Sequence, residues 1–344
     1  MAVDWTQQLS LEGAYYLPTC PSDWRVLAQW QLQAELNIFT AGNWVCLGET
    51  ALRINYGFHQ ADEHFTDTAS VKLYRTWLKA GNTQSEFRLG LQRLNFGSAT
   101  LIRPLQWFDN LRPNDPQEQT EGVQAALFRY FWLNNANLWL WAIRNDGQSR
   151  GFTLVSGSQG SAGMGGRWQI PVLKGEAGIS YHHNLQTEML NIQQGAEDKL
   201  GLDYRTSGWL GFWLEGAANH LSSPLNLPAW QVSLTQGLDW SLPLGNSLHA
   251  LMENNVYLTA EQAVDTLSPR TWQTAFSLDY PLGLLDALFL YDVFDYEGDN
   301  HLASVIWRRT YDRLSWDASL FWNSGGSHAL TKDRGAQLSI NYTF

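Results

Sequence analysis

Residues 314–322 read LSWDASLFW, and residues 337–344, the last in the chain, read QLSINYTF. The first stretch has apolar side chains at every second position, namely Leu314, Trp316, Ala318, Leu320 and Trp322. The second stretch repeats this pattern at Leu338, Ile340, Tyr342 and Phe344. A period of two sends successive side chains to opposite faces of a strand, so both stretches are predicted to be β-strands with one apolar and one polar face.

The aromatic residues of these two strands lie near the ends of the apolar face. A strand packed on a soluble core would also alternate. Aromatic side chains at both ends of an apolar face, with polar groups on the other face, are nevertheless typical of a strand that faces lipid. The chain also stops on Phe344, which resembles the closing strand of bacterial outer-membrane barrels. The two stretches therefore favour a lipid-facing strand pair.

The composition is rich in aromatic residues and poor in charge. The 344 residues include 18 Trp, 13 Tyr and 15 Phe, while 16% of them are charged. Membrane barrels have this blend because half of each strand faces lipid and half faces water. No run of about 18 apolar residues occurs, which excludes a membrane-spanning helix. The net charge of -11 argues against a nucleic-acid partner.

The chain start and the cysteines bear on the compartment. The first residues, MAVD, have neither the basic segment nor the apolar core of a signal sequence, so we expect that an export signal has been removed. Cys20 and Cys46 fall near opposite ends of the predicted barrel, and we expect two free thiols rather than a disulfide. Cys46 is interpreted as a small apolar side chain.

Eighteen alternating stretches can be placed along the chain, and a miscounted hairpin would leave sixteen. The third contains residues 52–58. The others span residues 5–16, 24–39, 71–79, 86–95, 123–133, 138–144, 167–173, 176–183, 200–205, 209–219, 230–240, 247–258, 271–280, 285–294, 303–311, 314–322 and 337–344. No linker divides them, so residues 1–344 are predicted to form a single all-β domain.

The connections between these stretches alternate in length. Every second connection is short, and those between are generally longer and rich in Gly, Pro, Ser or Asp, such as residues 156–166 and an acidic loop with Asp62, Glu63 and Asp67. Outer-membrane barrels have short periplasmic turns and long outer loops. The pattern predicts a transmembrane antiparallel β-barrel with both termini on the periplasmic side.

The face opposite the apolar one carries a mixed set of polar residues. It contains Arg25, Gln29, Gln31, Glu35, Glu49, Arg53, Glu176, His182, Asp203, Arg205, Glu215, Asp239, His249, Glu253, Asp279, Arg308 and Asp317. A barrel of about sixteen to eighteen strands leaves an aqueous lumen, whereas about eight strands fill themselves with side chains. These residues are therefore predicted to line the wall of a channel.

The longest connection, residues 97–122, is the candidate for narrowing this lumen. Its prolines stiffen it, and Leu101, Trp107 and Phe108 need burial. We expect it to fold into the barrel, although a loop packed over the rim would also bury these side chains. The predicted constriction residues are Arg88, Gln92, Arg103, Phe108, Asp109, Arg112 and Asp115.

The basic residues of this region suggest a preference for anions. Arg88, Arg103 and Arg112, with Gln92, could form a patch, since guanidinium groups pair bidentately with carboxylates. The alternative is that these arginines form cross-strand pairs that keep the wall hydrated.

Several short motifs here carry a family resemblance. They are the segments RLGLQ at residues 88–92, FG at 96–97, RP at 103–104, FD at 108–109 and PNDP at 113–116. Together they resemble the signature of large outer-membrane porins of the alginate-export and related uncharacterised groups. The resemblance implies a porin-like fold and a transport role in the outer membrane of a Gram-negative bacterium, and it implies no particular ligand.

The sequence offers no catalytic or metal-binding constellation. The segment GSQGS at residues 157–161 lacks the strand-to-helix setting of a nucleophile elbow. His182, His183 and His249 do not have metal-ligand spacing, and Asp295, Glu297 and Asp299 are interpreted as a solvated acidic loop. We expect no enzymatic activity, no cofactor and no bound metal.

The predicted function is passive diffusion of small hydrophilic solutes through the outer membrane, with an anion preference as a further option. The expected partners are membrane lipid, lipopolysaccharide and the solutes themselves. The alternative is a barrel that sheathes a partner protein, such as an electron-transfer or secretion component. The pattern leaves a homo-oligomer or a protein partner open.

Overall fold

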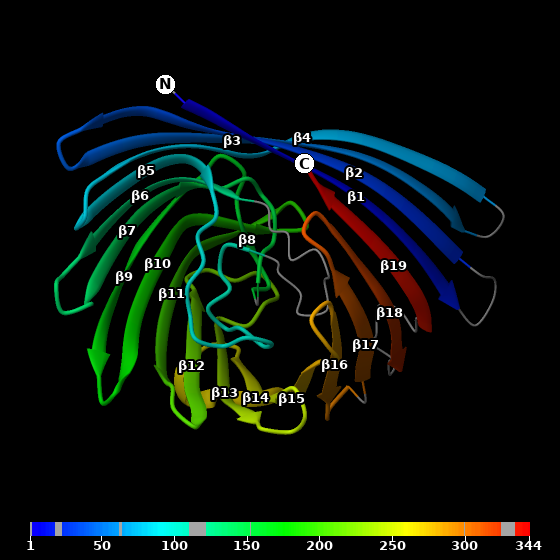
Figure 1. The fold of residues 1–344 in the computed structure, drawn as a ribbon. Helices are drawn as coiled ribbons and strands as arrows, with labels where there is room; N and C mark the ends of the chain where they lie inside the picture. Colours follow the sequence, from blue (N-terminus) through cyan, green and yellow to red (C-terminus); the bar gives the residue numbers. More distant parts are fainter. Residues whose placement is uncertain are drawn as a thin grey trace.

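The computed structural model describes residues 2–17, 23–61, 64–109, 122–151, 153–298, 300–324 and 334–344. Figure 1 shows that the strands form a ring with two connections folded inside it. The strands are β1 (Ala2–Leu17), β2 (Asp23–Ala41), β3 (Trp44–Ala61), β4 (His64–Gly81), β5 (Ser85–Gln92), β6 (Val123–Phe131), β7 (Asn137–Arg144), β8 (Ser156–Gly157), β9 (Ala162–Val172), β10 (Gly175–Met189), β11 (Ile192–Thr206), β12 (Leu210–Leu221), β13 (Trp230–Leu242), β14 (Leu248–Ala260), β15 (Ser268–Pro281), β16 (Asp286–Asp295), β17 (Asn300–Thr310), β18 (Leu314–Ser324) and β19 (Arg334–Thr343). A single turn of 3-10 helix spans Val264–Thr266.

The sheet closes on itself through its first and last strands. β1 pairs with β19 in antiparallel register, with Leu11 opposite Ile340, and β1 also pairs with β2. β8 is a two-residue strand that pairs only with the end of β10, and β7 pairs directly with β9. The predicted closed antiparallel barrel of eighteen strands is therefore confirmed, with β8 as an addition inside a connection.

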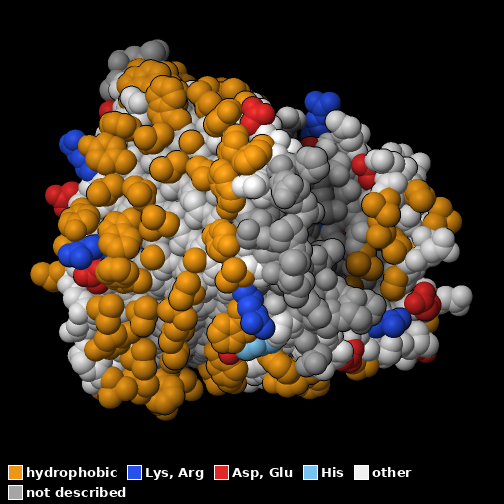
Figure 2. Space-filling model, turned by 90° about the vertical axis from the view of Figure 1, so that its right-hand side faces the viewer, with side chains coloured by type: hydrophobic (Ala, Val, Ile, Leu, Met, Phe, Trp, Pro, Cys, Tyr) orange, Lys and Arg blue, Asp and Glu red, His pale blue; other side chains and the backbone are white. Residues whose placement is uncertain are grey.

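Alternating side chains give the barrel an apolar outer wall and a polar inner wall. On β12, Trp213 and Glu215 point inward and are fully or almost fully buried, whereas Leu214 between them is 46% exposed. Figure 2 shows that hydrophobic side chains are spread over one side of the outer wall and outnumber the charged side chains there. Large apolar side chains exposed over a whole wall are stable only against a non-aqueous surrounding. No helix among the described residues is long and apolar enough to cross a membrane.

Two hairpins are longer than the sequence predicts. β10 and β11 reach Met189 and Ile192 and are joined through Leu190 and Asn191, both at positive φ, where we expected a long loop. Two successive residues at positive φ form the tight turn that matches strand twist. The expected alternation of short and long connections is therefore incomplete.

The second such hairpin is β3–β4. β4 begins at His64, so Asp67 lies in a strand and not in the expected acidic loop, while Asp62 and Glu63 lie outside the described residues. The expected Gly/Ser-rich loop is also shorter, because β9 begins at Ala162. Cys46 carries a free, half-buried thiol, and Cys20 lies outside the described residues.

Candidate functional site

The connection between β5 and β6 is described as far as Asp109, and its residues 98–105 lie against the inner wall of β12. The Glu215 carboxylate of β12 accepts hydrogen bonds from the backbone N–H groups of Ser98, Ala99 and Leu105, at 2.6, 2.8 and 2.7 Å. An ionised carboxylate holding several N–H donors is a strong, charge-assisted arrangement. Glu215 therefore ties two separate points of the loop to the wall.

A second carboxylate repeats this arrangement on β14. Glu253 accepts from the backbone N–H groups of Thr100, Leu101 and Ile102 at 2.6, 2.9 and 2.6 Å. The indole N–H of Trp213 also donates to Glu253, at 2.9 Å. Six loop N–H groups thus end on two inward-facing carboxylates, which we call the carboxylate latch.

Gly97 allows the loop to approach the latch closely. Its φ of +106° lies in the region that favours glycine, and a Cβ built there would meet Glu215 Oε2 at 2.5 Å. Any side chain at this position would both strain the backbone and push the carboxylate away.

A buried ion pair reinforces the same end of the loop. Arg167 of β9 pairs with Asp203 of β11 through two contacts of 2.6 and 2.9 Å, and the Ser98 hydroxyl donates to Asp203 at 2.9 Å. The Arg167 guanidinium also lies 5.3 Å from the Phe96 ring. This end of the loop therefore contacts a buried ion pair whose two opposite charges compensate each other.

The apolar side chains of the loop are buried against β6 and β7. Phe96, Leu105, Trp107 and Phe108 form one cluster with wall residues that include Trp141. Phe96 stacks on Trp141 at 5.4 Å and meets Trp107 edge-on at 5.4 Å. The cluster fills the space between the loop and this side of the barrel.

The predicted constriction residues do not form one patch. Arg88 pairs with Glu86 at 3.1 Å and stacks over Trp77, whereas Arg103 contacts Asn95 and lies 3.9 Å from Asp109. Gln92 is fully buried and donates to the Ala125 carbonyl at 2.9 Å, and Phe108 and Asp109 are also buried. Arg112 and Asp115 lie outside the described residues.

The predicted wall residues point inward and are mostly paired across strands. The pairs are Arg25 with Glu12 at 2.6 Å, Arg205 with Asp239 at 3.7 Å, His249 with Asp239 and Asp279 at 3.6 Å each, and Arg308 with Asp317 at 2.6 Å. Gln29 is buried, and Glu35 lies opposite Glu49. Glu215 and Glu253 form the latch.

A basic wall covers the inner face of β3–β6. Its cations are Arg53, Lys72, Arg75, Lys79, Arg88 and Arg129, and the carboxylates on the same described faces are Glu49 and Glu86. Several of the guanidinium groups rest on aromatic rings, with Arg53 3.9 Å from Tyr74 and Arg129 3.8 Å from Trp139. Stacking holds a guanidinium in place and leaves its N–H edge available for hydrogen bonds.

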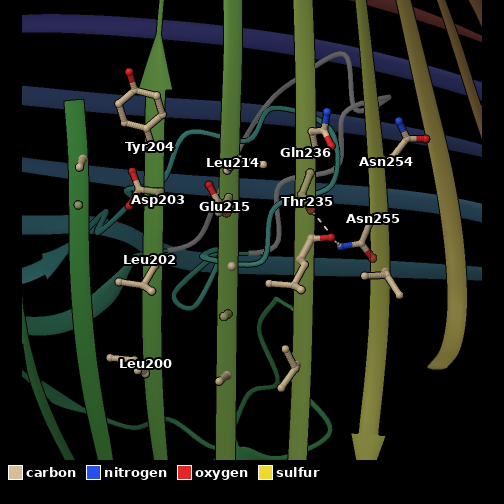
Figure 3. A pocket seen from close by; sticks show the side chains of 18 of the residues that line it. Leu200, Leu202, Asp203, Tyr204, Leu214, Glu215, Thr235, Gln236, Asn254 and Asn255 are labelled. Atoms are coloured by element: carbon tan, nitrogen blue, oxygen red, sulfur yellow. Dashed lines mark hydrogen bonds between the residues drawn. The ribbon is translucent and has the colours of Figure 1, made fainter. Parts of the chain in front are cut away.

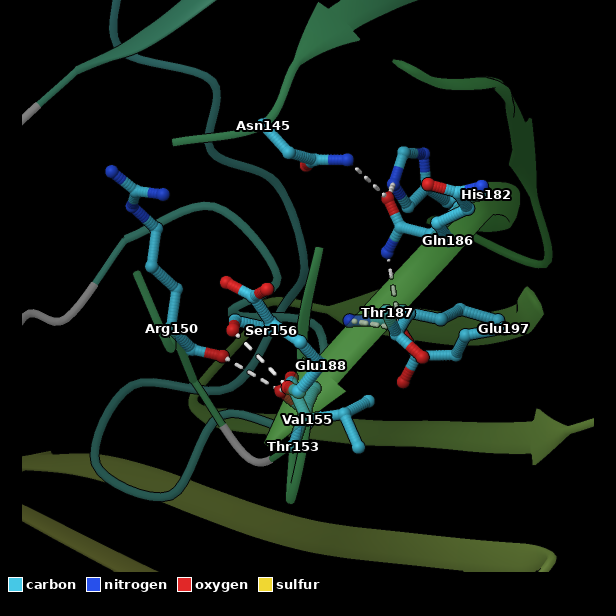
Figure 4. A network of polar contacts seen from close by, with 12 residues as sticks. Asn145, Arg150, Thr153, Val155, Ser156, His182, Gln186, Thr187, Glu188 and Glu197 are labelled. Carbon is cyan, nitrogen blue, oxygen red and sulfur yellow. Dashed lines mark hydrogen bonds and ion pairs between the residues drawn. The ribbon is translucent and has the colours of Figure 1, made fainter. Parts of the chain in front are cut away.

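The connection between β7 and β9 also folds inward and is held by the polar network of Figure 4. Asn145 donates to Asn184 at 3.2 Å, Asn184 donates to Glu197 at 3.1 Å, and Lys199 lies 3.3 Å from Glu197. A Cβ on Gly151 of this connection would meet the Gln106 carbonyl oxygen at 1.7 Å. The two inward connections are therefore in contact with each other.

The pKa of one titratable group of this connection is shifted. Burial alone would raise the pKa of Asp146, but hydrogen bonds and attraction from Arg150, at 2.6 and 2.8 Å, lower it below its ordinary value. Among the described residues, no cluster of three or more His, Cys, Asp or Glu side chains could hold a metal ion.

Sequence reasoning missed Arg167, Arg75, Arg129 and the role of Gly97. Arg167 follows the inward period set by its outward neighbour Trp168, so alternation could have found it. Arg129 shares its face with Val123, Ala125 and Leu127, and this apolar run hides the inward direction.

No family model matches the chain, and no curated protein matches it in sequence. Solved structures do resemble it. OpdQ of Pseudomonas aeruginosa has a TM-score of 0.64 at 10% identity, with 100% of this chain and 99% of that chain covered. OccAB1 of Acinetobacter baumannii has a TM-score of 0.65 at 8% identity, with 99% and 96% covered. OmpF of Salmonella typhi, in a complex with daunomycin, has a TM-score of 0.57 at 11% identity, with 99% and 97% covered.

These likenesses concern the fold. The chain has the barrel fold of bacterial outer-membrane porins along its whole length, so the predicted porin-like fold is confirmed. The narrower resemblance to the alginate-export group stays a prediction.

Proposed function

We propose that the protein is an outer-membrane channel of a Gram-negative bacterium through which small hydrophilic solutes diffuse passively. The observation that carries this proposal is a closed barrel of eighteen strands whose wall is apolar outside and charged inside. A ring of this size is too wide for its own side chains to fill. Diffusion through it needs the gradient of the solute and no cofactor, and the proposal assigns the chain no enzymatic role.

The inward loop is proposed to set the size limit. The carboxylate latch supports this role, since six backbone hydrogen bonds hold residues 98–105 at a fixed distance from the wall of β12–β14. A loop held in this way narrows the lumen without moving with the solute. The constriction then lies between the loop and the part of the basic wall on β3–β5, because the aromatic cluster closes the space towards β6 and β7.

An anion preference is the finer part of the proposal. The basic wall carries six cations against the two carboxylates Glu49 and Glu86. An excess of one charge in a narrow, low-dielectric passage raises the local concentration of the opposite ion. Solutes with a carboxylate or phosphate group are therefore expected to enter more readily than cations of the same size.

The second candidate function is a sheath for a partner protein. Such a barrel would need a lumen that a folded protein can occupy, but here two connections of the chain itself lie inside. This observation favours the channel over the sheath.

The test is conductance of the purified protein in a planar lipid bilayer. The channel predicts stepwise, ohmic openings, and a tenfold KCl gradient should give a reversal potential of the sign for chloride permeation. Silence at all voltages would refute the channel. Openings that select cations would refute the anion preference alone.

A further inference from the structure

Three aromatic side chains lie in one row on the inner face of β16–β19 and β1, which adjoin one another in the closed sheet (Figure 1). The register places Tyr291 opposite Ser304, Ser304 opposite Phe321, Phe321 opposite Gly335, and Gly335 opposite Tyr16. Aromatic and small residues therefore alternate from strand to strand at one level of the barrel. We call Tyr291, Phe321 and Tyr16 the aromatic row.

The aromatic row faces the lumen. Phe321 follows Leu320, which is 65% exposed on the lipid side, and stands four positions from the inward Asp317. Tyr16 stands four positions from the inward Glu12, and Tyr291 shares this face through the register of the row. Side chains an even number of positions apart on a strand share a face. The three rings are half-buried, so part of each remains accessible.

Inward side chains on the opposite part of the wall are polar or covered. On β11–β14 they include Asp203, Glu215 and Thr235, and Asn255 donates to Thr235 at 2.9 Å (Figure 3). Trp213 of β12 also points inward, but it is fully buried. Apolar surface left in contact with water gains nothing from the hydrophobic effect. The accessible rings of the aromatic row are therefore available to contact a solute.

The middle ring of the row is held in place. A Cβ built on Gly335 would meet Phe321 Cζ at 2.6 Å, so the tip of the Phe321 ring occupies the space that the glycine leaves. The Tyr16 ring meets Phe321 edge-on, with 5.6 Å between the ring centroids. Edge-to-face packing is a favourable arrangement of two aromatic rings. The row thus presents a fixed aromatic surface.

The charges beside the row compensate each other. Arg308 pairs with Asp317 and Arg25 pairs with Glu12, each at 2.6 Å. Both carboxylates are buried, whereas the two arginine side chains are 32% and 44% exposed. Asp317 and Glu12 lie four positions from the row, which is about 13 Å along the strands. The accessible groups are therefore N–H donors whose positive charge a buried carboxylate offsets.

We propose that the aromatic row and these two ion pairs bind neutral sugars on their way through the channel. A pyranose ring has a face of C–H groups, which suits the negative face of an aromatic ring, and hydroxyls at its edge that accept from guanidinium N–H groups. An anion gains little from a wall whose charges are compensated. The inference rests on the proposed channel function and adds a substrate class that the basic wall does not select.

Blockage of the ion current by maltotriose tests this binding in a planar bilayer. Maltotriose should interrupt the current of the wild-type channel in brief events that saturate with concentration. Phe321→Ala should raise the half-saturation concentration by about 2–13-fold, the value of one aromatic contact, whereas Phe321→Tyr should leave it close to the wild type. Phe276→Ala is the matched control, because it removes the same ring from the lipid-facing side of β15. Equal half-saturation concentrations for Phe321→Ala and the wild type would overturn the proposal.

A second solute separates binding from size. Polyethylene glycol of the same mass as maltotriose has no pyranose ring and should block only at much higher concentration. Equal blockage by the two solutes, or blockage by benzoate and not by maltotriose, would overturn the sugar assignment. The open-channel current of each variant shows that its barrel is assembled. Absence of any opening in the wild type refutes the channel, whereas openings that maltotriose does not interrupt refute the sugar site alone.

Discussion

Neutralising the carboxylate latch should loosen the inward loop without unfolding the barrel. In Glu215→Gln the side chain keeps its shape, but an –NH₂ group replaces one oxygen. Glu215 Oε2 accepts from Ser98 and Ala99, and Oε1 accepts from Leu105. Whichever way the amide turns, at least one backbone N–H of the loop faces a donor instead of an acceptor.

The size of the effect can be estimated from these contacts. A hydrogen bond to a charged group contributes about 1.5–3 kcal/mol. Removing the buried charge offsets part of this lost free energy, because Glu215 is almost fully buried and its ionised form is costly to desolvate. The net loss of loop attachment is then about 1–3 kcal/mol, which shifts the equilibrium towards the detached loop by about 5–150-fold.

Single-channel recording measures this equilibrium directly. We expect Glu215→Gln, and likewise Glu253→Gln, to show frequent transitions to a larger conductance that are rare in the wild type. Glu176→Gln is the matched control, since Glu176 also faces inward on the same barrel but contacts Gln169 and not the loop. If the latch variants record like Glu176→Gln, the loop is not held by these carboxylates and the reasoning fails.

Three further predictions address other parts of the site. Gly97→Ala should loosen the same loop by about 1–3 kcal/mol, because of its positive φ and the clash with Glu215, and should match Glu215→Gln in recordings. Arg129→Gln should move the reversal potential in a KCl gradient towards zero. An unchanged potential would show that the basic wall does not determine the ion selectivity. The Asp146–Arg150 ion pair, whose carboxyl has a lowered pKa, should persist to a lower pH than the ordinary pKa of an aspartate would allow. The contribution of this ion pair to stability is fully present above the ordinary pKa of aspartate and is lost as the pH falls through the lowered pKa. NMR titration of the Asp146 carboxyl would check this.

The barrel could be predicted because its signal is local. Each strand carries its own alternation, and Trp213 and Glu215 take the inward side simply by being two positions apart. The prediction lost accuracy where the alternation breaks. The register of β10 against β11 shifts between Asn184 and Thr187, and this irregularity ends the regular pattern although the hairpin continues to Met189.

The contacts of the site could not be predicted, because they join distant parts of the chain through backbone groups. Glu215 meets the N–H of Ser98, 117 positions away, and a backbone N–H leaves no mark in the sequence. Nothing local distinguishes Glu215, which holds the loop, from Glu176, which does not. The apolar side chains of Trp107 and Phe108 predicted that they are buried. Their contact with Trp141 could not be predicted, because it depends on the path of the loop through the barrel.

The same backbone contacts bear on selectivity. The chain carries a net charge of -11, yet Glu215 and Glu253 each face three loop N–H groups, and Asp203 faces Arg167. Carboxylates occupied by these donors offer little negative charge to a passing solute, whereas the cations of β3–β6 outnumber the carboxylates beside them. We infer that the loop, by covering the acidic side of the lumen, lets the basic wall determine which ion enters. Releasing the latch through Gly97→Ala, which keeps both carboxylates, should therefore weaken the anion preference as well as enlarge the pore.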